Sequence, residues 1–276
     1  MPASPSEPSA FVDAVTTAII RRVDHYAELV DAAKADGRLE RAEEIMLLDR
    51  FEHYTADVLD RYPPPGPRNR ESLAFVHLYR ERDDDTSAED RCRALLAALM
   101  AAEVESRGPL RLTQAQNGRL AAILERIGAA CGKEGLLLHA ALAFERAAGI
   151  YLLLSDNAGR DRCLYERTRF RQKSTGPGLP KALLAVSWTL CGYGYKPYRL
   201  LAWVAIQLVV FSLGVALTVP GSVWHGIYLS VTNYLDPQGS DELSATAQML
   251  LVTESYVSAV SLSVFFALLV HRWFRI

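Results

Sequence analysis

Apolar residues recur every three or four positions through roughly the first 175 residues, and two long apolar runs follow. This recurrence is typical of amphipathic helices, because about 3.6 residues per turn bring such positions to one face. No segment alternates in the way that predicts a half-buried strand. Clusters of Gly, Pro and Asp divide this part into predicted helices over residues 11–35, 38–61, 70–82, 87–106, 113–131, 136–154 and 158–174. The pattern therefore predicts an all-α fold.

The two apolar runs cover residues 198–219 and 248–270. A bilayer core about 30 Å thick is crossed by roughly 20 helical residues, so each run is long enough to span a membrane. The first residues lack the basic and apolar order of a signal peptide, and we expect them to form a disordered tail. The predicted parts are a tail at 1–10, a helical domain at 11–173, a linker with an interfacial segment at 174–197, and a membrane domain at 198–276.

Lys and Arg lie on one side of the two apolar runs. Lys196 and Arg199 stand at the start of the first run and Arg272 and Arg275 follow the second, whereas the loop at 220–247 contains neither residue type. Because the cytoplasmic flanks of membrane helices carry an excess of Lys and Arg, we expect both termini in the cytoplasm and the loop outside. The sequence thus predicts a multi-pass protein of the cell membrane, in contact with membrane lipids.

The last helices of the predicted cytoplasmic domain are similar to a tetratricopeptide-type hairpin. Ala143, Phe144, Ala147 and Tyr151 have the spacing of such a hairpin, and a short turn leads into the next helix. A single hairpin cannot bury its own core, so we expect neighbouring helices to stack on it. A domain of this kind is expected to bind a protein or a small ligand.

Catalytic and metal-binding patterns are missing from the sequence. The four cysteines are scattered, without a CxxC pair or a Cys/His cluster. Asp36, Gly37 and Glu43 match part of an EF-hand loop, but Lys34 stands where a calcium ligand belongs. With no phosphate-binding glycine loop, HExxH or nucleophile elbow, the sequence predicts no enzyme and no cofactor. No nucleic-acid-binding pattern is recognised in the chain, and we assign the arginines of 160–173 to anionic lipid head groups.

Gly192-Tyr193-Gly194 spells the centre of a potassium selectivity filter. A filter needs this tripeptide between two membrane helices and after a re-entrant helix. Here it precedes the first span. We therefore interpret it as a bend, because Gly permits the turn and Pro197 suits the first turn of a new helix.

The loop between the spans holds an amphipathic stretch at 222–235, with Trp224 and Tyr228 four residues apart. The stretch is too short to cross a bilayer but has the length of a half-membrane helix. Polar sequence without helical periodicity follows at 236–242, and irregular backbone is tolerated at membrane depth only where it is buried in protein or lines water. Two arrangements remain open: a re-entrant helix, or a helix that lies on the outer membrane surface.

With these elements, roughly the last hundred residues resemble the two-transmembrane-helix, pore-loop family of bacterial potassium-channel-like proteins. The family's pre-membrane element is matched by Gly192, Tyr193, Gly194, Pro197 and Arg199. Its pore helix is matched by Trp224, Tyr228, Ser230 and Thr232. The resemblance implies a homotetramer with a central cation pore.

The selectivity filter of that family would fall on about residues 236–241. The candidate pore residues in and beside this segment are Asp236, Gln238, Gly239, Asp241 and Glu242. Pro237 fixes its own φ, and the paired glycines that turn carbonyl groups toward an ion are missing. The resemblance therefore implies either a cation pore with weakened potassium selectivity or a relative that no longer conducts.

Three polar residues share one face of the second span. Glu254, Ser258 and Ser261 are spaced i, i+4 and i+7. A carboxyl group facing lipid would cost roughly 3 kcal/mol, so Glu254 is expected to face a lumen, a partner helix or the pore helix. It would either brace the loop and add negative potential along a cation path, or be held by hydrogen bonds in helix packing. Both interpretations predict an oligomer.

Three functions fit these patterns. The first is a cation channel, or a channel-like protein, regulated by its cytoplasmic helical domain. The second is a helical-repeat adaptor or scaffold that the two spans only anchor and oligomerise. The third is an effector that permeabilises its own membrane.

Overall fold

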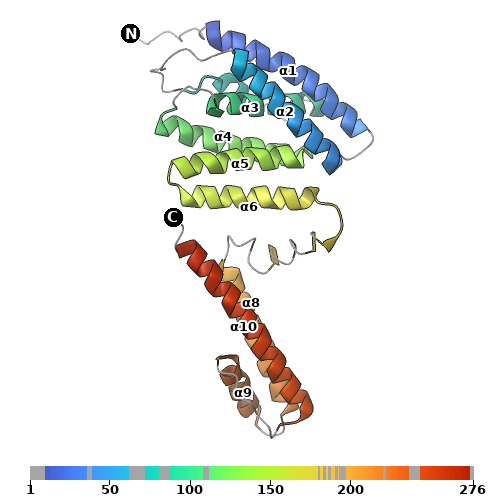
Figure 1. Cartoon of the computed structure of the whole chain (residues 1–276), viewed down its shortest axis with the longest axis vertical. Helices are drawn as coiled ribbons and strands as arrows, with labels where there is room; N and C mark the ends of the chain where they lie inside the picture. The colour runs from blue at the N-terminus through green and yellow to red at the C-terminus, as the bar shows by residue number, and fades with distance from the viewer. Residues whose placement is uncertain are drawn as a thin grey trace. The chain divides into compact units, whose positions relative to one another are not determined.

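The computed structural model describes residues 10–35, 39–61, 72–80, 87–107, 112–179, 181–182, 185, 188–189, 192, 197–219, 222–235 and 243–273. Every regular element within them is a helix, so the predicted all-α class is confirmed (Figure 1). The chain divides into two compact units, Met1–Lys181 and Ala182–Ile276.

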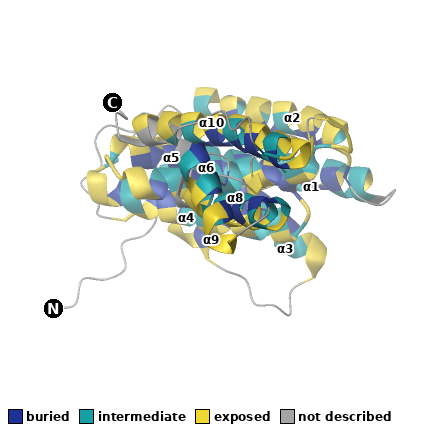
Figure 2. Ribbon diagram, turned by 90° about the horizontal axis from the view of Figure 1, so that it is seen from below, coloured by how far each residue is buried: buried dark blue, intermediate teal, exposed yellow. Residues whose placement is uncertain are grey.

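The first unit is built from helices whose bounds lie close to the predicted ones. They are α1 (Ala10–Ala35), α2 (Arg41–Arg61), α3 (Ala88–Arg107), α4 (Gln114–Lys133), α5 (Leu137–Leu153) and α6 (Asn157–Ser174). Helices α4, α5 and α6 lie side by side as successive antiparallel layers, and α1 and α2 pack against each other and against α3 (Figure 1). Buried residues recur every three or four positions along α1, α2 and α4, as in amphipathic helices, whereas α3 is buried throughout residues 96–105 (Figure 2).

Two turns of the same geometry fold α4, α5 and α6 against one another. Gly135 and Ser155 have left-handed backbones, with φ of 82° and 58°. In each turn the following amide donates to a carbonyl five residues back, Leu136 to Cys131 and Asp156 to Tyr151, both at 2.9 Å. This bond satisfies a helix-end carbonyl and reverses the chain. The stacking expected around the last hairpin is present, whereas the likeness of that hairpin to a tetratricopeptide repeat stays a prediction.

A buried polar chain ties α1, α2 and α5 together. The carboxylate of Glu44 accepts hydrogen bonds from the backbone amides of Leu138 and His139, at 2.7 and 3.2 Å, and lies 3.0 Å from His139 Nδ1. The other ring nitrogen of His139 lies 2.7 Å from the hydroxyl of Tyr26. A carboxylate is favourable here because helix α5 begins at these amides. Burial, followed by the charge of Glu44, raises the pKa of Tyr26 well above its ordinary value.

The helix predicted over 70–82 is wrong for the described residues 72–80. They contain only a short 3-10 helix, η1 (Val76–Tyr79). The carboxylate of Glu105 accepts hydrogen bonds from the backbone amide of Ala74 and, at 2.7 Å, from the hydroxyl of Tyr79. Gln116 donates to the carbonyl of Ser72 at 3.3 Å. Side chains of α3 and α4 thus satisfy polar groups that a helix would have satisfied within itself.

The arginines of α6 pair with carboxylates of the neighbouring helices. Arg162 pairs with Glu125 of α4 at 2.7 Å. Arg167 and Arg171 both pair with Glu145 of α5 at 3.0 Å. Arg162, Arg167 and Arg171 are thus engaged within the helical unit, and the assignment of the run at 160–173 to lipid head groups stays a prediction.

The second unit contains the two apolar runs and a shorter helix between them. Its helices are α8 (Pro197–Thr218), α9 (Val223–Leu235) and α10 (Ala245–Trp273), and each packs against the other two. Two segments, Arg199–Thr218 and Ala245–Ala267, are long and apolar enough to cross a membrane. Only 17% and 22% of their apolar windows are buried, whereas the core helix of a soluble protein would be mostly buried. The exposed apolar surface supports a membrane location.

Candidate functional site

Helix α9 runs back along α8. A Cβ atom added to Gly226 would lie 2.5 Å from the Cα atom of Ala216, so the two backbones are in direct contact. Four residues further along α9, Ser230 accepts a hydrogen bond from the hydroxyl of Ser212 at 3.2 Å. Gly226 contacts Ala216, and Ser230, later on α9, contacts Ser212, earlier on α8, so the two helices are antiparallel. Glycine at 226 permits this close approach.

The central feature of the unit is a buried carboxyl group shared by all three helices. The hydroxyl of Ser230 donates to Glu254 Oε1 at 2.6 Å, and Asn233 Nδ2 lies 3.2 Å from Glu254 Oε2. Asn233 Nδ2 also donates to the carbonyl of Leu251 at 2.9 Å. With Ser212 on α8, these residues form the Glu254 network. Glu254 and Ser230 are both completely buried.

The other two members of the polar face also pack within the chain. Ser258 is buried and donates to the carbonyl of Ser255 at 2.9 Å. Ser261 donates to the side-chain carbonyl of Gln207 on α8 at 3.0 Å. Since Glu254, Ser258 and Ser261 are buried inside one chain, the packing interpretation of this face is favoured over the interpretation in which it lines a lumen.

Asn233 is the functional candidate that the sequence reasoning missed. It lies seven residues after Gly226 and three after Ser230, so the three share one face of α9. This is the same i, i+4, i+7 spacing that drew attention to Glu254, Ser258 and Ser261. A search for a matching polar face on the shorter helix would have found it.

The remaining pore-helix candidates point away from this network. Trp224 is 78% exposed and Tyr228 is 66% exposed. The hydroxyl of Thr232 donates to the carbonyl of Tyr228 at 2.8 Å, within α9 itself. Trp224 and Tyr228 are therefore available to lipid or to another molecule.

One buried polar atom of α9 has no hydrogen-bond partner among the described residues. It is the hydroxyl oxygen of Tyr234, whose side chain is buried. Buried hydroxyl groups nearly always have a partner, because an unpaired one costs about 1–3 kcal/mol. Tyr234 directly follows Asn233 and precedes the polar sequence that joins α9 to α10.

The structure describes the pre-membrane element at Gly192, Pro197 and Arg199. Gly192 has φ of 56°, and its amide donates to the carbonyl of Trp188 at 3.1 Å. Arg199 also donates to this carbonyl at 3.2 Å, and its guanidinium lies 5.4 Å from the centre of the Trp188 ring. Helix α8 begins at Pro197, where a new helix was expected. Arg199 therefore links the start of α8 to Trp188.

Several candidates lie outside the described residues. They are Tyr193, Gly194, Asp236, Gln238, Gly239, Asp241 and Glu242, together with Asp36 and Gly37 of the EF-hand-like stretch. Within the described part of the chain, no group of three or more His, Cys, Asp or Glu side chains is placed to hold a metal ion. Cys92, Cys131 and Cys163 are free thiols, and burial raises the pKa of Cys163 to about 12.

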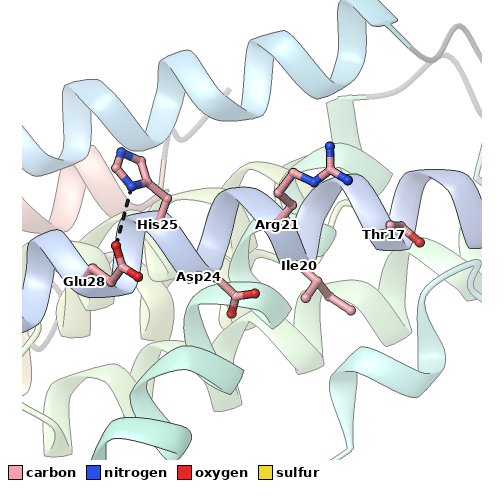
Figure 3. Close-up of a pocket in the computed structure, with 6 residues that line it drawn as sticks. All are labelled: Thr17, Ile20, Arg21, Asp24, His25 and Glu28. Atoms are coloured by element: carbon pink, nitrogen blue, oxygen red, sulfur yellow. Dashed lines mark ion pairs between the residues drawn. The ribbon is translucent and has the colours of Figure 1, made fainter.

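A surface hollow on α1 is one of several concave features of the first unit that carry titratable side chains. Its volume is 490 Å³ and its lining comes from α1 alone, namely Thr17, Ile20, Arg21, Asp24, His25 and Glu28 (Figure 3). His25 and Glu28 are 3.7 Å apart, and both are largely exposed. One exposed helix face with charges of both signs offers no enclosed position for a ligand.

No known protein family, curated protein or solved structure matches the chain. The sequence and fold show an all-helical protein with two long apolar helices near its C-terminal end. The chemistry of the Glu254 network and of the surrounding helices is therefore the basis for a functional proposal.

Proposed function

We propose that this chain is a multi-pass membrane protein whose α8–α10 unit forms a homotetrameric cation pore, regulated by its cytoplasmic helical unit. The observation that carries the proposal is the position of α9. This helix of 13 residues is folded back along α8 and joined to α8 and α10 through the buried Glu254 network.

The contacts of α9 favour re-entry over a position on the membrane surface. Ser212 lies about 9 Å along α8 from its end, and Glu254 lies about 13 Å along α10 from its start. Ser230 contacts both. A helix lying flat at the outer surface would not reach polar groups at these depths of two membrane-spanning helices. At about 1.5 Å per residue, α9 is about 20 Å long, which is less than the bilayer core.

The polar sequence between α9 and α10 then becomes the candidate ion path. It carries Asp236, Asp241 and Glu242, with no Lys or Arg. In the proposal, these carboxylates form rings at the outer mouth of a symmetric assembly and concentrate cations there. Pro237 and the absence of paired glycines favour a pore that passes cations with weak selectivity between potassium and sodium.

The exposed apolar surface supports assembly. Trp224, Tyr228, Tyr256 and Val260 are all exposed on α9 and α10 of a single chain. Two spans and a half-length helix enclose no lumen on their own, so several copies related by rotational symmetry are needed. Some of these side chains would face lipid in the assembly and others would face the neighbouring copy.

The test is electrical recording from purified full-length protein in a planar bilayer, with potassium on one side and sodium on the other. We expect discrete openings and a reversal potential near zero, as for a weakly selective cation pore. Asp241→Asn is expected to reduce single-channel conductance. Asp161→Asn, a change of the same charge in α6, is the control and is expected to leave conductance unchanged. Anion-dependent currents, or silence from folded tetramers across voltage and pH, would contradict the proposal.

A second candidate function is a membrane-anchored adaptor. The burial of Glu254, Ser258 and Ser261 favours it, because the polar face of α10 serves helix packing. A hydrophilic tag inserted at 236–242 separates the two functions. An adaptor would keep its membrane insertion, assembly and partner binding, whereas a pore would lose its conductance.

A further inference from the structure

A groove on the helical unit lies between α3 and α4, with η1 along one edge. Its volume is 440 Å³, which is within the usual range of about 300–1,000 Å³ for ligand sites. The apolar floor is formed mainly by Ala94, Leu95, Ala98, Ile123, Ile127 and Ala130. We call this feature the α3–α4 groove.

The groove is long and open. Helices α3 and α4 are antiparallel along it, since Arg91 near the start of α3 pairs at 3.2 Å with Glu134, which follows the end of α4. The lining residues of α4 extend from Ile123 to Lys133, which corresponds to about 15 Å or three helical turns. Alanines on the floor leave room for the backbone of another helix. These dimensions suit an amphipathic helix laid into the groove.

Positive charge surrounds the apolar floor. Arg80, Arg91, Arg126 and Lys133 line the groove, together with one carboxylate, that of Glu134. Glu134 already pairs with Arg91. Arg80 and Lys133 make no ion pair within the described residues, and both are exposed. A groove with this rim attracts a negatively charged partner and repels a positively charged one.

We propose that the α3–α4 groove binds an acidic amphipathic helix of about three turns from a partner protein. The apolar face of that helix covers the alanines, leucine and isoleucines of the floor, and its carboxylates face Arg80 and Lys133. The proposal concerns the helical unit alone and holds whether or not the membrane unit conducts ions.

The test uses full-length protein in phosphatidylcholine nanodiscs and fluorescein-labelled peptides of about twelve residues, with empty nanodiscs as the blank. The acidic probe carries leucines at i, i+3, i+4 and i+7 and glutamates on the opposite face. A second peptide has the same composition with its leucines scattered around the helix. A third has lysines in place of the glutamates. Fluorescence anisotropy gives the affinity of each.

We expect the acidic amphipathic probe to bind and the other two to bind at least about tenfold more weakly. The double variant Arg80→Glu/Lys133→Glu should weaken binding of the acidic probe by about tenfold or more, because two attractions become repulsions. Arg50→Glu/Arg61→Glu makes the same change in net charge outside the groove and should leave binding unchanged. Ala129→Trp, at an exposed lining position, should also block binding without changing charge.

Other results would overturn the proposal. Equal binding of the scattered peptide would mean simple counter-ion attraction. Binding of tripolyphosphate that is lost in Arg80→Glu/Lys133→Glu, with no binding of the acidic probe, would identify a small-anion site. A change of oligomeric state in the groove variants, with no peptide binding in the wild type, would show that a second copy of the chain covers the groove.

Discussion

Removal of the Glu254 carboxyl group is the most direct test of how α9 is held. In Glu254→Ala, Ser230 loses its acceptor at 2.6 Å and Asn233 loses one at 3.2 Å. Two buried hydrogen bonds contribute about 1 kcal/mol each, and the space left by the side chain adds to their loss. We therefore expect the free energy of unfolding of the α8–α10 unit to fall by about 3 kcal/mol.

The partner residues decide how that loss is divided. Ser230→Ala removes only the hydroxyl and should cost about 1 kcal/mol. In the double variant, the Ser230–Glu254 bond is already absent, so the two effects should not add. Coupling energies for hydrogen bonds between membrane helices are about 0.6 kcal/mol on average and reach roughly 1.7 kcal/mol, and we expect about 1 kcal/mol here. Glu254→Gln keeps an acceptor for Ser230 but faces Asn233 with an amide group, so about half of the loss is expected.

The measurement is unfolding in mixed micelles titrated with sodium dodecyl sulfate and followed by circular dichroism. Hydrogen exchange of the α9 amides should speed up in Glu254→Ala, because α9 loses its link to α10. Thr253→Ala is the matched control, since Thr253 is exposed and its hydroxyl donates only to the carbonyl of Met249 in the same helix. Additivity of Glu254→Ala and Ser230→Ala within about 0.3 kcal/mol would refute the network.

Three further predictions rest on single residues. Gly226→Ala should destabilise the α8–α10 unit by about 1–3 kcal/mol in the same titration, because the added methyl group meets the backbone of α8. Gly149→Ala, which has open space around it, is the control and should stabilise α5 by up to about 1 kcal/mol in urea unfolding. Equal effects of the two substitutions would refute the close approach of α9 to α8. Ser155→Gly should increase the free energy of unfolding of the helical unit by about 0.5–1 kcal/mol and so raise its melting temperature, because φ of Ser155 is 58° and glycine adopts this angle without strain. An unchanged melting temperature would argue against the left-handed turn. Burial acts to raise the pKa of Glu125, but hydrogen bonds from Arg162 and Tyr151 bring it below its ordinary value, so the stability from this group is present above the ordinary carboxyl pKa and is lost as pH falls through the lowered one. Urea unfolding between pH 6 and 3 should show this loss in wild type and a flatter profile in Glu125→Gln.

The sequence predicted most helices because hydrophobic periodicity is a local property of the chain. The faces of α1 and α4 that carry recurring apolar residues are the faces that are buried. The two long apolar runs were also recognised from the sequence, since length and hydrophobicity alone determine whether a helix can span a bilayer. The prediction failed at 70–82, where Glu105 and Gln116 of distant helices supply the hydrogen bonds.

The candidate site was predicted in part for the same reason. The spacing of Glu254, Ser258 and Ser261 identified a polar face, and that face is buried. The identity of its partners depends on how α8, α9 and α10 approach one another, and no local pattern encodes that approach. Asn233 was missed because its role appears only when α9 is folded back against α10. The filter-like residues at 236–242 lie outside the described residues, so their assignment stays a prediction.

The bond between Glu44 and the start of α5 has a consequence for how the protein is made. The carboxylate of Glu44 and the amide of Leu138 are separated by 94 positions in the chain. At a synthesis rate of about 5–20 residues per second, α2 waits roughly 5–20 s after its own synthesis before its buried partners leave the ribosome. During that interval the apolar faces of α1 and α2, with Tyr26 and Phe51 at their centre, lack the covering that α5 later provides. The N-terminal half of the helical unit is therefore a nascent-chain segment on which a holding chaperone would be expected to act.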